Sequence, residues 1–351
     1  MKALSKQEPT MTSDDTVSGI TLCEVPKGCW FEGTAVRPNG QVLAVRVDAP
    51  ELYIFDPSDP TKPPRLVHRF DDYQGSITMA RLEGYPEAYV LNACNFNFEA
   101  CRHTNLSLLR VEFGSGDDEA PKSEIIKRLD DEAGHSALCS VTNRILLFGD
   151  GYKGCIWKFD MVTGEREELI SDPTTLGPAN AEELAYGLTR IRYVANYLWY
   201  NNLTKGLVCR IPVAVGDGPD GHIRITGAVE IVSDEAPNVD DIKITPDGRF
   251  VYGTDLNDGI LWKLTVDPVS GKGRRQDLVT NAVALSAVEL LYGADGSSET
   301  KPKLFALCSG AADAVWVKSD QQEEKGVKNG GEIKVEVEIK QEITRADEGE
   351  H

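Results

Sequence analysis

Short apolar runs recur along the chain at a spacing of about fifty residues, and a turn and a second strand-like stretch follow each run. The runs begin at Val42, Ala88, Ile145, Leu198, Phe250 and Leu304. Successive starts lie between 46 and 57 residues apart, and periods of this size are typical of solenoids, propellers and repeat arrays. The chain therefore consists of one structural unit repeated six times.

Each repeat is rich in β-branched and aromatic residues, and its strands are separated by turn sequences such as PNG (38–40), PDG (246–248) and NDG (257–259). We take the apolar runs as the innermost strands of the repeats. The pattern predicts an all-β fold, a six-bladed β-propeller of four-stranded antiparallel blades around a central channel. One propeller domain is expected over residues 18–318.

The two ends of the chain differ from the repeats. Residues 1–17 are polar, and we expect them to be disordered. The stretch 18–26 could add a strand to the last blade. Residues 319–351 are expected to form a polar linker and an acidic tail, with an extra strand over 332–343, because apolar and charged residues alternate strictly there. A solvated charged tail is the alternative for this segment.

Composition limits the choice of partners and of compartment. The net charge is −19 and the isoelectric point is near 4.7, so neither nucleic acid nor an anionic membrane is expected to bind. Acidity of this kind is more often a solubility feature than a functional one. The start of the chain lacks an apolar signal-peptide core, so a cytoplasmic location is expected. The eight cysteines are scattered, which favours reduced thiols over a zinc site. The oligomeric state stays open.

Candidate chemistry lies eight to eleven residues ahead of the apolar runs, where all repeats should converge at one mouth of the channel. This ring contains two carboxylates, Glu32 and Asp240, together with His135 and Tyr186. Burial and a like-charged neighbour raise the pKa of a carboxyl group, which suits Glu32 or Asp240 to proton transfer. His135 and Tyr186 would donate hydrogen bonds to a developing oxyanion. A structural histidine and a packing tyrosine are the alternatives.

The same ring offers candidate substrate contacts. Trp30, Phe31 and Tyr73 would stack on an apolar ligand, and Ser76 and Ser286 would lie beside it. The predicted partner is therefore an apolar small molecule.

Several stretches carry a resemblance to a known family. They are FEGTAVRPNGQVLAVRVDAPELYIFDP (31–57), ILLFGDGYKGCIWKFD (145–160), YLWYNNLTKGLVCRIPV (197–213) and VDDIKITPDGRFVYGT (239–254). Across roughly residues 18–318 the chain resembles the fungal SMP-30/gluconolactonase-like (lactonohydrolase-like) six-bladed propellers. The resemblance implies a divalent cation, usually Ca²⁺, held by a Glu, an Asp and Asn residues. The Glu falls on Glu32 and the Asp on Asp240. Tyr186-Gly187 stands where the family has Asn-Gly, as does His135-Ser136.

Three functions follow as hypotheses. The chain lacks the Asn ligands of the family. In this respect it resembles the hetero-Diels–Alderases of tropolone–sesquiterpenoid pathways within the fungal branch. The resemblance then implies a metal-independent enzyme of fungal secondary metabolism without a cofactor. It would remove water to form a quinone methide and join this diene to a terpene or polyketide partner. The alternative is a Ca²⁺-dependent lactonase in which Glu32 and Asp240 hold the metal. The third hypothesis is a non-catalytic binding propeller.

Overall fold

A computed structural model gives the fold of the chain. It describes residues 18–20, 28–59, 61–97, 102–114, 120–129, 135–177, 186–216, 222–280, 282, 285–292, 303–308 and 335–338. The segment 1–17, the linker 319–334 and the tail after 338 lie outside the described residues.

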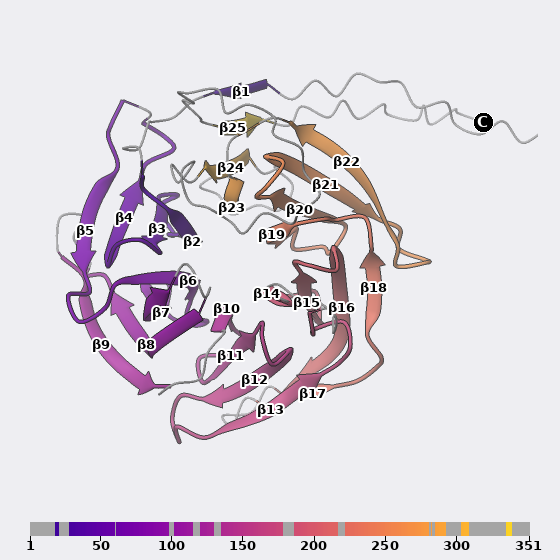
Figure 1. The fold of residues 1–351 in the computed structure, drawn as a ribbon, viewed down its shortest axis with the longest axis horizontal. Coiled ribbons are helices and arrows are strands. Elements are labelled where there is room, and N and C mark those ends of the chain that lie inside the picture. The colour runs from indigo at the N-terminus through magenta and orange to yellow at the C-terminus, as the bar shows by residue number, and fades with distance from the viewer. Residues whose placement is uncertain are drawn as a thin grey trace, which may run out of the picture.

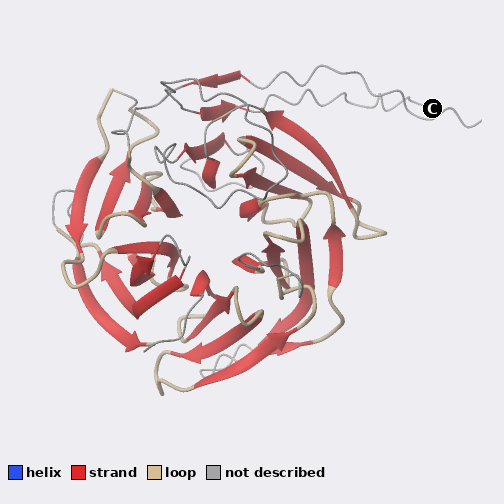
Figure 2. Cartoon of the chain, in the orientation of Figure 1, coloured by secondary structure: helices blue, strands red, loops and turns tan. Residues whose placement is uncertain are grey.

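Five sheets are formed by strands that follow one another along the chain, all paired antiparallel (Figures 1 and 2). The first contains β2 (Phe31–Val36), β3 (Val42–Arg46), β4 (Glu51–Phe55) and β5 (Arg65–Arg69). The second contains β6 (Gly75–Arg81), β7 (Ala88–Asn97), β8 (Arg102–Glu112) and β9 (Lys122–Arg128). The third contains β10 (His135–Ser140), β11 (Ile145–Asp150), β12 (Cys155–Asp160) and β13 (Arg166–Ser171).

The fourth sheet contains β14 (Leu188–Val194), β15 (Tyr197–Asn202) and β16 (Leu207–Val215), and both β17 (Ile223–Ile225) and β18 (Glu230–Ser233) pair with β16. The fifth contains β19 (Val239–Ile244), β20 (Phe250–Asp255), β21 (Ile260–Val266) and β22 (Gly273–Val279). These five complete blades confirm the prediction of an all-β propeller with four-stranded antiparallel blades.

A further sheet is built from both ends of the described chain. It contains β23 (Leu285–Leu291), β24 (Lys303–Cys308), β25 (Val335–Glu338) and β1 (Ser18–Ile20), in the order β23-β24-β25-β1. The stretch DAVWVKSD (313–320), expected to follow the last apolar run as a strand, lies outside the described residues. The count of six blades stays a prediction.

The position of the apolar runs corrects one expectation. The runs are the second strands of the blades, and the innermost strands are β2, β6, β10, β14, β19 and β23, which precede them (Figure 1). Each innermost strand contacts the innermost strands on either side. Residues of β11 are all buried because neighbouring blades cover both faces of a second strand, whereas an innermost strand has one face toward the channel. The most continuous apolar run therefore marks the second position.

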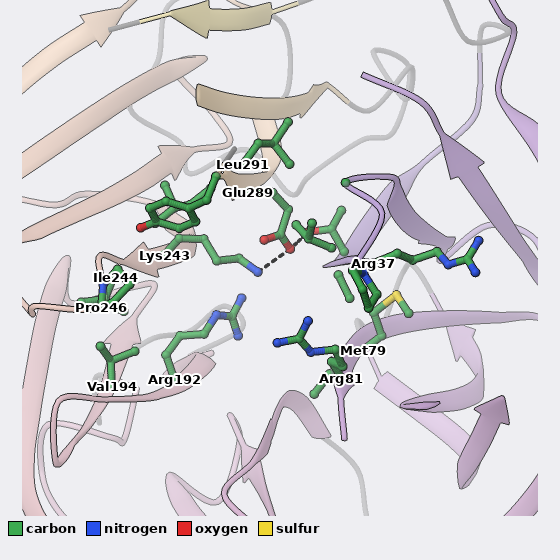
Figure 3. A pocket seen from close by; sticks show the side chains of 18 of the residues that line it. Arg37, Met79, Arg81, Arg192, Val194, Lys243, Ile244, Pro246, Glu289 and Leu291 are labelled. Atoms are coloured by element: carbon green, nitrogen blue, oxygen red, sulfur yellow. Dashed lines mark hydrogen bonds and ion pairs between the residues drawn. The ribbon is translucent and has the colours of Figure 1, made fainter. Parts of the chain in front are cut away.

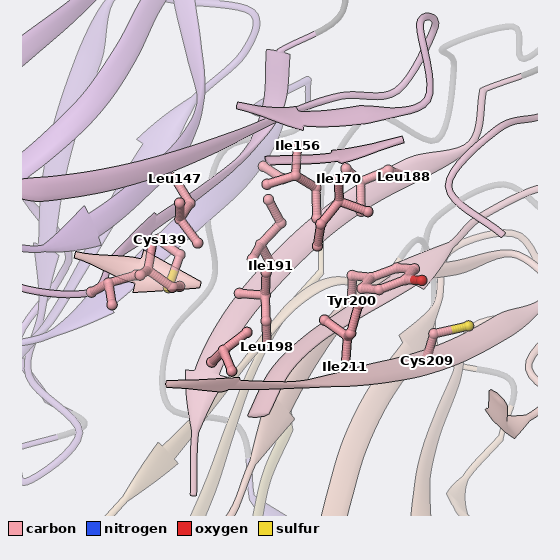
Figure 4. Packing of buried hydrophobic residues seen from close by; sticks show 14 of the residues in the cluster. Cys139, Leu147, Ile156, Ile170, Leu188, Ile191, Leu198, Tyr200, Cys209 and Ile211 are labelled. Carbon is pink, nitrogen blue, oxygen red and sulfur yellow. The ribbon is translucent and has the colours of Figure 1, made fainter. Parts of the chain in front are cut away.

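The core lies between adjacent blades. One cluster joins the third and fourth blades, where Leu147, Ile191 and Tyr200 interdigitate with their neighbours (Figure 4). The first and second blades also approach each other closely at Gly75, at the start of β6. A Cβ at this position would collide with the backbone carbonyl of Val47 in the first blade. The described part of the chain contains no helix that could cross a membrane.

Candidate functional site

A cavity of about 980 Å³ lies at the end of the channel where the innermost strands finish. Its lining includes the last residue of every innermost strand, namely Val36, Arg81, Ser140, Val194, Ile244 and Leu291. Cavities of this size hold drug-sized ligands. The cavity is thus at the opposite end of these strands from the ring of site residues predicted from the sequence, such as Glu32 and Asp240.

The lining combines apolar walls with basic groups. The apolar residues include Ala35, Val36, Met79, Leu138, Ile191, Val194, Ile244, Leu290 and Leu291. The charged residues are Arg37, Arg81, Arg192, Lys243, Lys303 and Glu289. In a chain of net charge −19, the described residues thus give this cavity an excess of positive charge.

A buried ion pair lies in the lining of the cavity (Figure 3). Lys243 Nζ lies 2.5 Å from Glu289 Oε1, and the Thr34 hydroxyl donates to the same oxygen at 2.7 Å. Burial lowers the pKa of Lys243, and the nearby charge of Arg192 lowers it further, while Glu289 opposes both. The lysine side chain is 14% exposed, and its ammonium is a stronger acid than a lysine in water.

A second ion pair lies beside it. Arg192 Nη2 is 2.6 Å from Asp241 Oδ1, and Asp241 also accepts hydrogen bonds from the backbone amides of Ile242 and Val288. Burial alone would raise the pKa of Asp241. The positive charges of Arg192, Lys243 and Arg190 outweigh burial, so the pKa of Asp241 lies below its usual value.

The two predicted carboxylates meet around Arg190. Glu32 accepts a hydrogen bond from Trp30 Nε1 at 2.7 Å and one from Arg190 Nη2 at 2.8 Å. Burial raises the pKa of Asp240 well above its usual value, and the charge of Glu32 adds to the rise. Burial also raises the pKa of Glu32, against the effect of Arg190. Both carboxyl groups therefore take up a proton more readily than a carboxyl group in water.

The other site residues predicted from the sequence lie apart from the cavity. Phe31 packs edge-on against Tyr53 and Phe55 in the core. Ser286 donates to the backbone oxygen of Phe31 at 2.6 Å. Tyr73 is buried in the core between the first two blades.

Three predicted positions remain. Ser76 is fully buried at the start of β6. Tyr186 makes an edge-to-face contact with Tyr152, with ring centroids 4.8 Å apart. His135 begins β10 opposite Asp150, and its side chain lies outside the described residues. None of the predicted site residues is among the described residues that line the cavity. Their roles stay predictions.

Arg192, Lys243 and Glu289 were not predicted from the sequence. A signal for them was present, because LTRIRYV (188–194) and VDDIKI (239–244) place a charged residue at alternate positions of a strand. In a sheet, alternate residues point to one face. These segments are the innermost strands, whereas the apolar runs that were expected in that position are the second strands.

The described residues do not fit the Ca²⁺ ion that the family resemblance implies. Both oxygens of Glu32 already accept hydrogen bonds, one of them from the positively charged Arg190. Calcium takes six to eight oxygen ligands. No three His, Cys, Asp or Glu side chains in the described part of the chain lie together as metal ligands. A guanidinium group at this point instead supplies the positive charge that Glu32 requires.

No protein-family model and no curated protein matches the sequence. Solved structures do match. A Bacteroides thetaiotaomicron protein of unknown function is 15% identical with a TM-score of 0.55, covering 84% of this chain and 73% of that one. The PQQ-bound aldose sugar dehydrogenase of Streptomyces coelicolor is 12% identical with a TM-score of 0.54, covering 94% and 100%. An auxiliary nutrient binding protein of B. thetaiotaomicron is 11% identical with a TM-score of 0.54, covering 79% and 66%.

These likenesses show the fold, an all-β propeller. The proteins that share it include an enzyme and a binding protein. Membership of the fungal SMP-30/gluconolactonase-like propellers, and of their hetero-Diels–Alderase branch, stays a prediction from the sequence.

Proposed function

We propose that the protein is an enzyme that holds a small, largely apolar molecule in the channel cavity and removes water from it, after which the product closes a ring with a second molecule. One observation carries this proposal: a directly hydrogen-bonded Lys243–Glu289 pair lies in the lining of an apolar-walled cavity. The pair contains one group able to give a proton and one able to take a proton, side by side.

The pair can complete a closed proton cycle. In an ortho-hydroxybenzyl alcohol, the Lys243 ammonium would protonate the benzylic hydroxyl as its C–O bond breaks, so that water leaves. Glu289 would take the phenolic proton, and the electrons of that O–H bond would form the C=O of a quinone methide. Both contacts that Glu289 makes with described residues go to Oε1, so Oε2 is available for this proton. Rotation of the Glu289 carboxyl group would then turn this proton toward the neutral Lys243 amine, which takes it back and restores the ion pair.

Two features favour this direction of transfer. The lowered pKa of Lys243 makes its ammonium a better proton donor near neutral pH. The nearby charge of Arg192 stabilises negative charge that develops on the phenolic oxygen. The hetero-Diels–Alder step then needs no proton, because its two new bonds use only electrons of the diene and the alkene. The protein accelerates that step by holding a terpene or polyketide partner in place, an effect that reaches about 7–11 kcal/mol in favourable cases.

The proposal includes further expectations from the sequence. Glu32 or Asp240 would assist proton transfer, with no resident cofactor in the reaction. The sheet β23-β24-β25-β1 would be the sixth blade that closes the ring. Fungal secondary metabolism and a cytoplasmic location belong to the same proposal.

A model reaction tests the proposed chemistry. Salicyl alcohol loses water to give the simplest ortho-quinone methide, and ethyl vinyl ether captures it as ethoxychroman, which has one stereocentre. We expect the protein to raise the rate and to form one enantiomer in excess, as measured by chiral chromatography. Lys243→Met and Glu289→Gln should both return the reaction to the racemic buffer rate. Lys122→Gln, an exposed change on β9, is the control and should leave the product unchanged. Racemic product at the buffer rate with the unaltered protein would contradict the proposal.

A further inference from the structure

Arg81 differs from the other basic residues of the cavity. Arg37 pairs with Glu87 at 3.0 Å, Arg192 with Asp241 at 2.6 Å, and Lys243 with Glu289. The end of β6 places Arg81 in the lining, and no described residue gives its guanidinium a hydrogen bond or an ion pair. The cavity therefore carries a positive charge that its described neighbours do not neutralise.

The side chain of Arg81 points toward Arg192 across the cavity (Figure 3). The two residues come from different blades, at the ends of β6 and β14. Arg192 Nε is buried and has no acceptor among the described residues. Asp241 already pairs with Arg192, so an anion between the two guanidinium groups would be attracted mainly by the charge of Arg81, and it could accept a hydrogen bond from Arg192 Nε.

A third group is available in the same lining. The hydroxyl of Tyr292 is buried without a hydrogen-bond partner in the described part of the chain. Buried polar groups are nearly always hydrogen-bonded, so such a hydroxyl indicates either a water or a polar atom of a ligand. Burial raises the pKa of Tyr292 to about 12, which keeps the hydroxyl protonated as a donor.

We propose that Arg81 and Arg192 together bind an anionic group on the ligand, a carboxylate, sulfonate or phosphate, while the apolar walls hold its body. The guanidinium fork matches the planar or tetrahedral oxygens of such groups and binds them in a bidentate manner. This inference deepens the proposed function, on which it rests for the choice of cavity. It narrows the substrate class to amphiphilic anions.

Two fluorescent probes with the same apolar body test the inference. Anilinonaphthalene sulfonate carries an anionic group, and N-phenylnaphthylamine is its neutral counterpart. Each is titrated into the full-length protein, Arg81→Gln and Arg224→Gln, a control that makes the same charge change at an exposed position on β17. We expect Arg81→Gln to weaken binding of the sulfonate about tenfold or more, as is typical when a hydrogen bond between charged groups is lost. The neutral probe should bind Arg81→Gln as it binds the unaltered protein.

The outcomes separate the inference from its alternatives. Retained binding of the neutral probe shows that the cavity of the variant is intact. Equal losses for both probes, or equal losses in the Arg81 and Arg224 variants, would overturn the inference. Competition by naphthoate or by naphthyl phosphate would assign the preferred anion, whereas equally strong competition by naphthol would refute the anion site. The salicyl alcohol reaction needs no anionic group, so a failure there leaves this result standing.

Discussion

Substitutions in the Lys243–Glu289 pair should affect the stability of the protein and its activity in different ways. The two side chains are only 14% and 7% exposed, so Lys243→Met leaves the carboxylate of Glu289 buried with the Thr34 hydroxyl as its remaining donor. Breaking a buried ion pair from one side costs about 3–5 kcal/mol, because an uncompensated charge stays behind. The nearby Arg192 compensates in part, so we expect a loss of about 2–4 kcal/mol in the free energy of unfolding.

The double variant Lys243→Met/Glu289→Gln removes both charges. Replacing a whole buried pair by neutral groups of similar size is often neutral in stability, so the double variant should regain most of the loss. The assay is urea unfolding of the two single variants and the double variant, which gives a double-mutant cycle. Lys62→Met, which breaks a pair at an exposed lysine, is the control and should cost about 0–1 kcal/mol.

The same variants distinguish a structural pair from a catalytic one. If the pair only stabilises the fold, the double variant should recover the salicyl alcohol reaction together with its stability. We expect instead a stable double variant without activity, because both proton-transferring groups are gone. A single variant that loses less than about 1 kcal/mol would refute the argument from burial.

Three further predictions concern other parts of the fold. Burial raises the pKa of Asp255 to about 6, so the folded state loses stability as the pH rises through the window between 3.8 and about 6. Asp255→Asn should therefore stabilise by about 2–3 kcal/mol at pH 8 and by almost nothing at pH 4, as urea unfolding at both values would show; a pH-independent gain would contradict this. Gly75→Ala should lower the melting temperature by crowding the neighbouring blade, at a cost of about 1–3 kcal/mol, whereas Gly216→Ala has room and should not. Burial raises the pKa of the Cys94 and Cys209 thiols to about 12, so both should resist a thiol reagent at pH 8 until urea unfolds the chain; labelling of either thiol in the native protein would count against this.

The fold was largely predictable because a repeat leaves a periodic record in the sequence. Runs such as Ile145–Phe148 recur because each second strand must be apolar on both faces. The runs alone did not show whether they form the first or the second strand of each blade. A continuous apolar run indicates only that a strand is buried, and it does not give the position of that strand in the sheet. The innermost strand β14 was harder to recognise as a buried strand, because it contains two arginines. Their carboxylate partners Glu32 and Asp241 come from other blades.

The cavity lining was not predicted, and the catalytic roles of Glu32 and Asp240 stay predictions. The sequence did place these two carboxylates in one ring, and both lie at the starts of innermost strands. It could not supply Arg190 as their partner, since the contact joins residues 158 positions apart. Nor could it place the cavity, because the ends of strands such as β6 become a cavity lining only once six of them converge.

The pairing of β1 with β25 has a consequence for the order in which the molecule is made. The strands Ser18–Ile20 and Val335–Glu338 are more than 300 residues apart in the sequence, so their contact is of very long range. During synthesis five sheets can form and pack while β1 still lacks its partner. The contact forms only after residue 338 leaves the ribosome, and until then β24 presents an open edge. Nascent chains stalled before this residue should therefore be the aggregation-prone species of this protein.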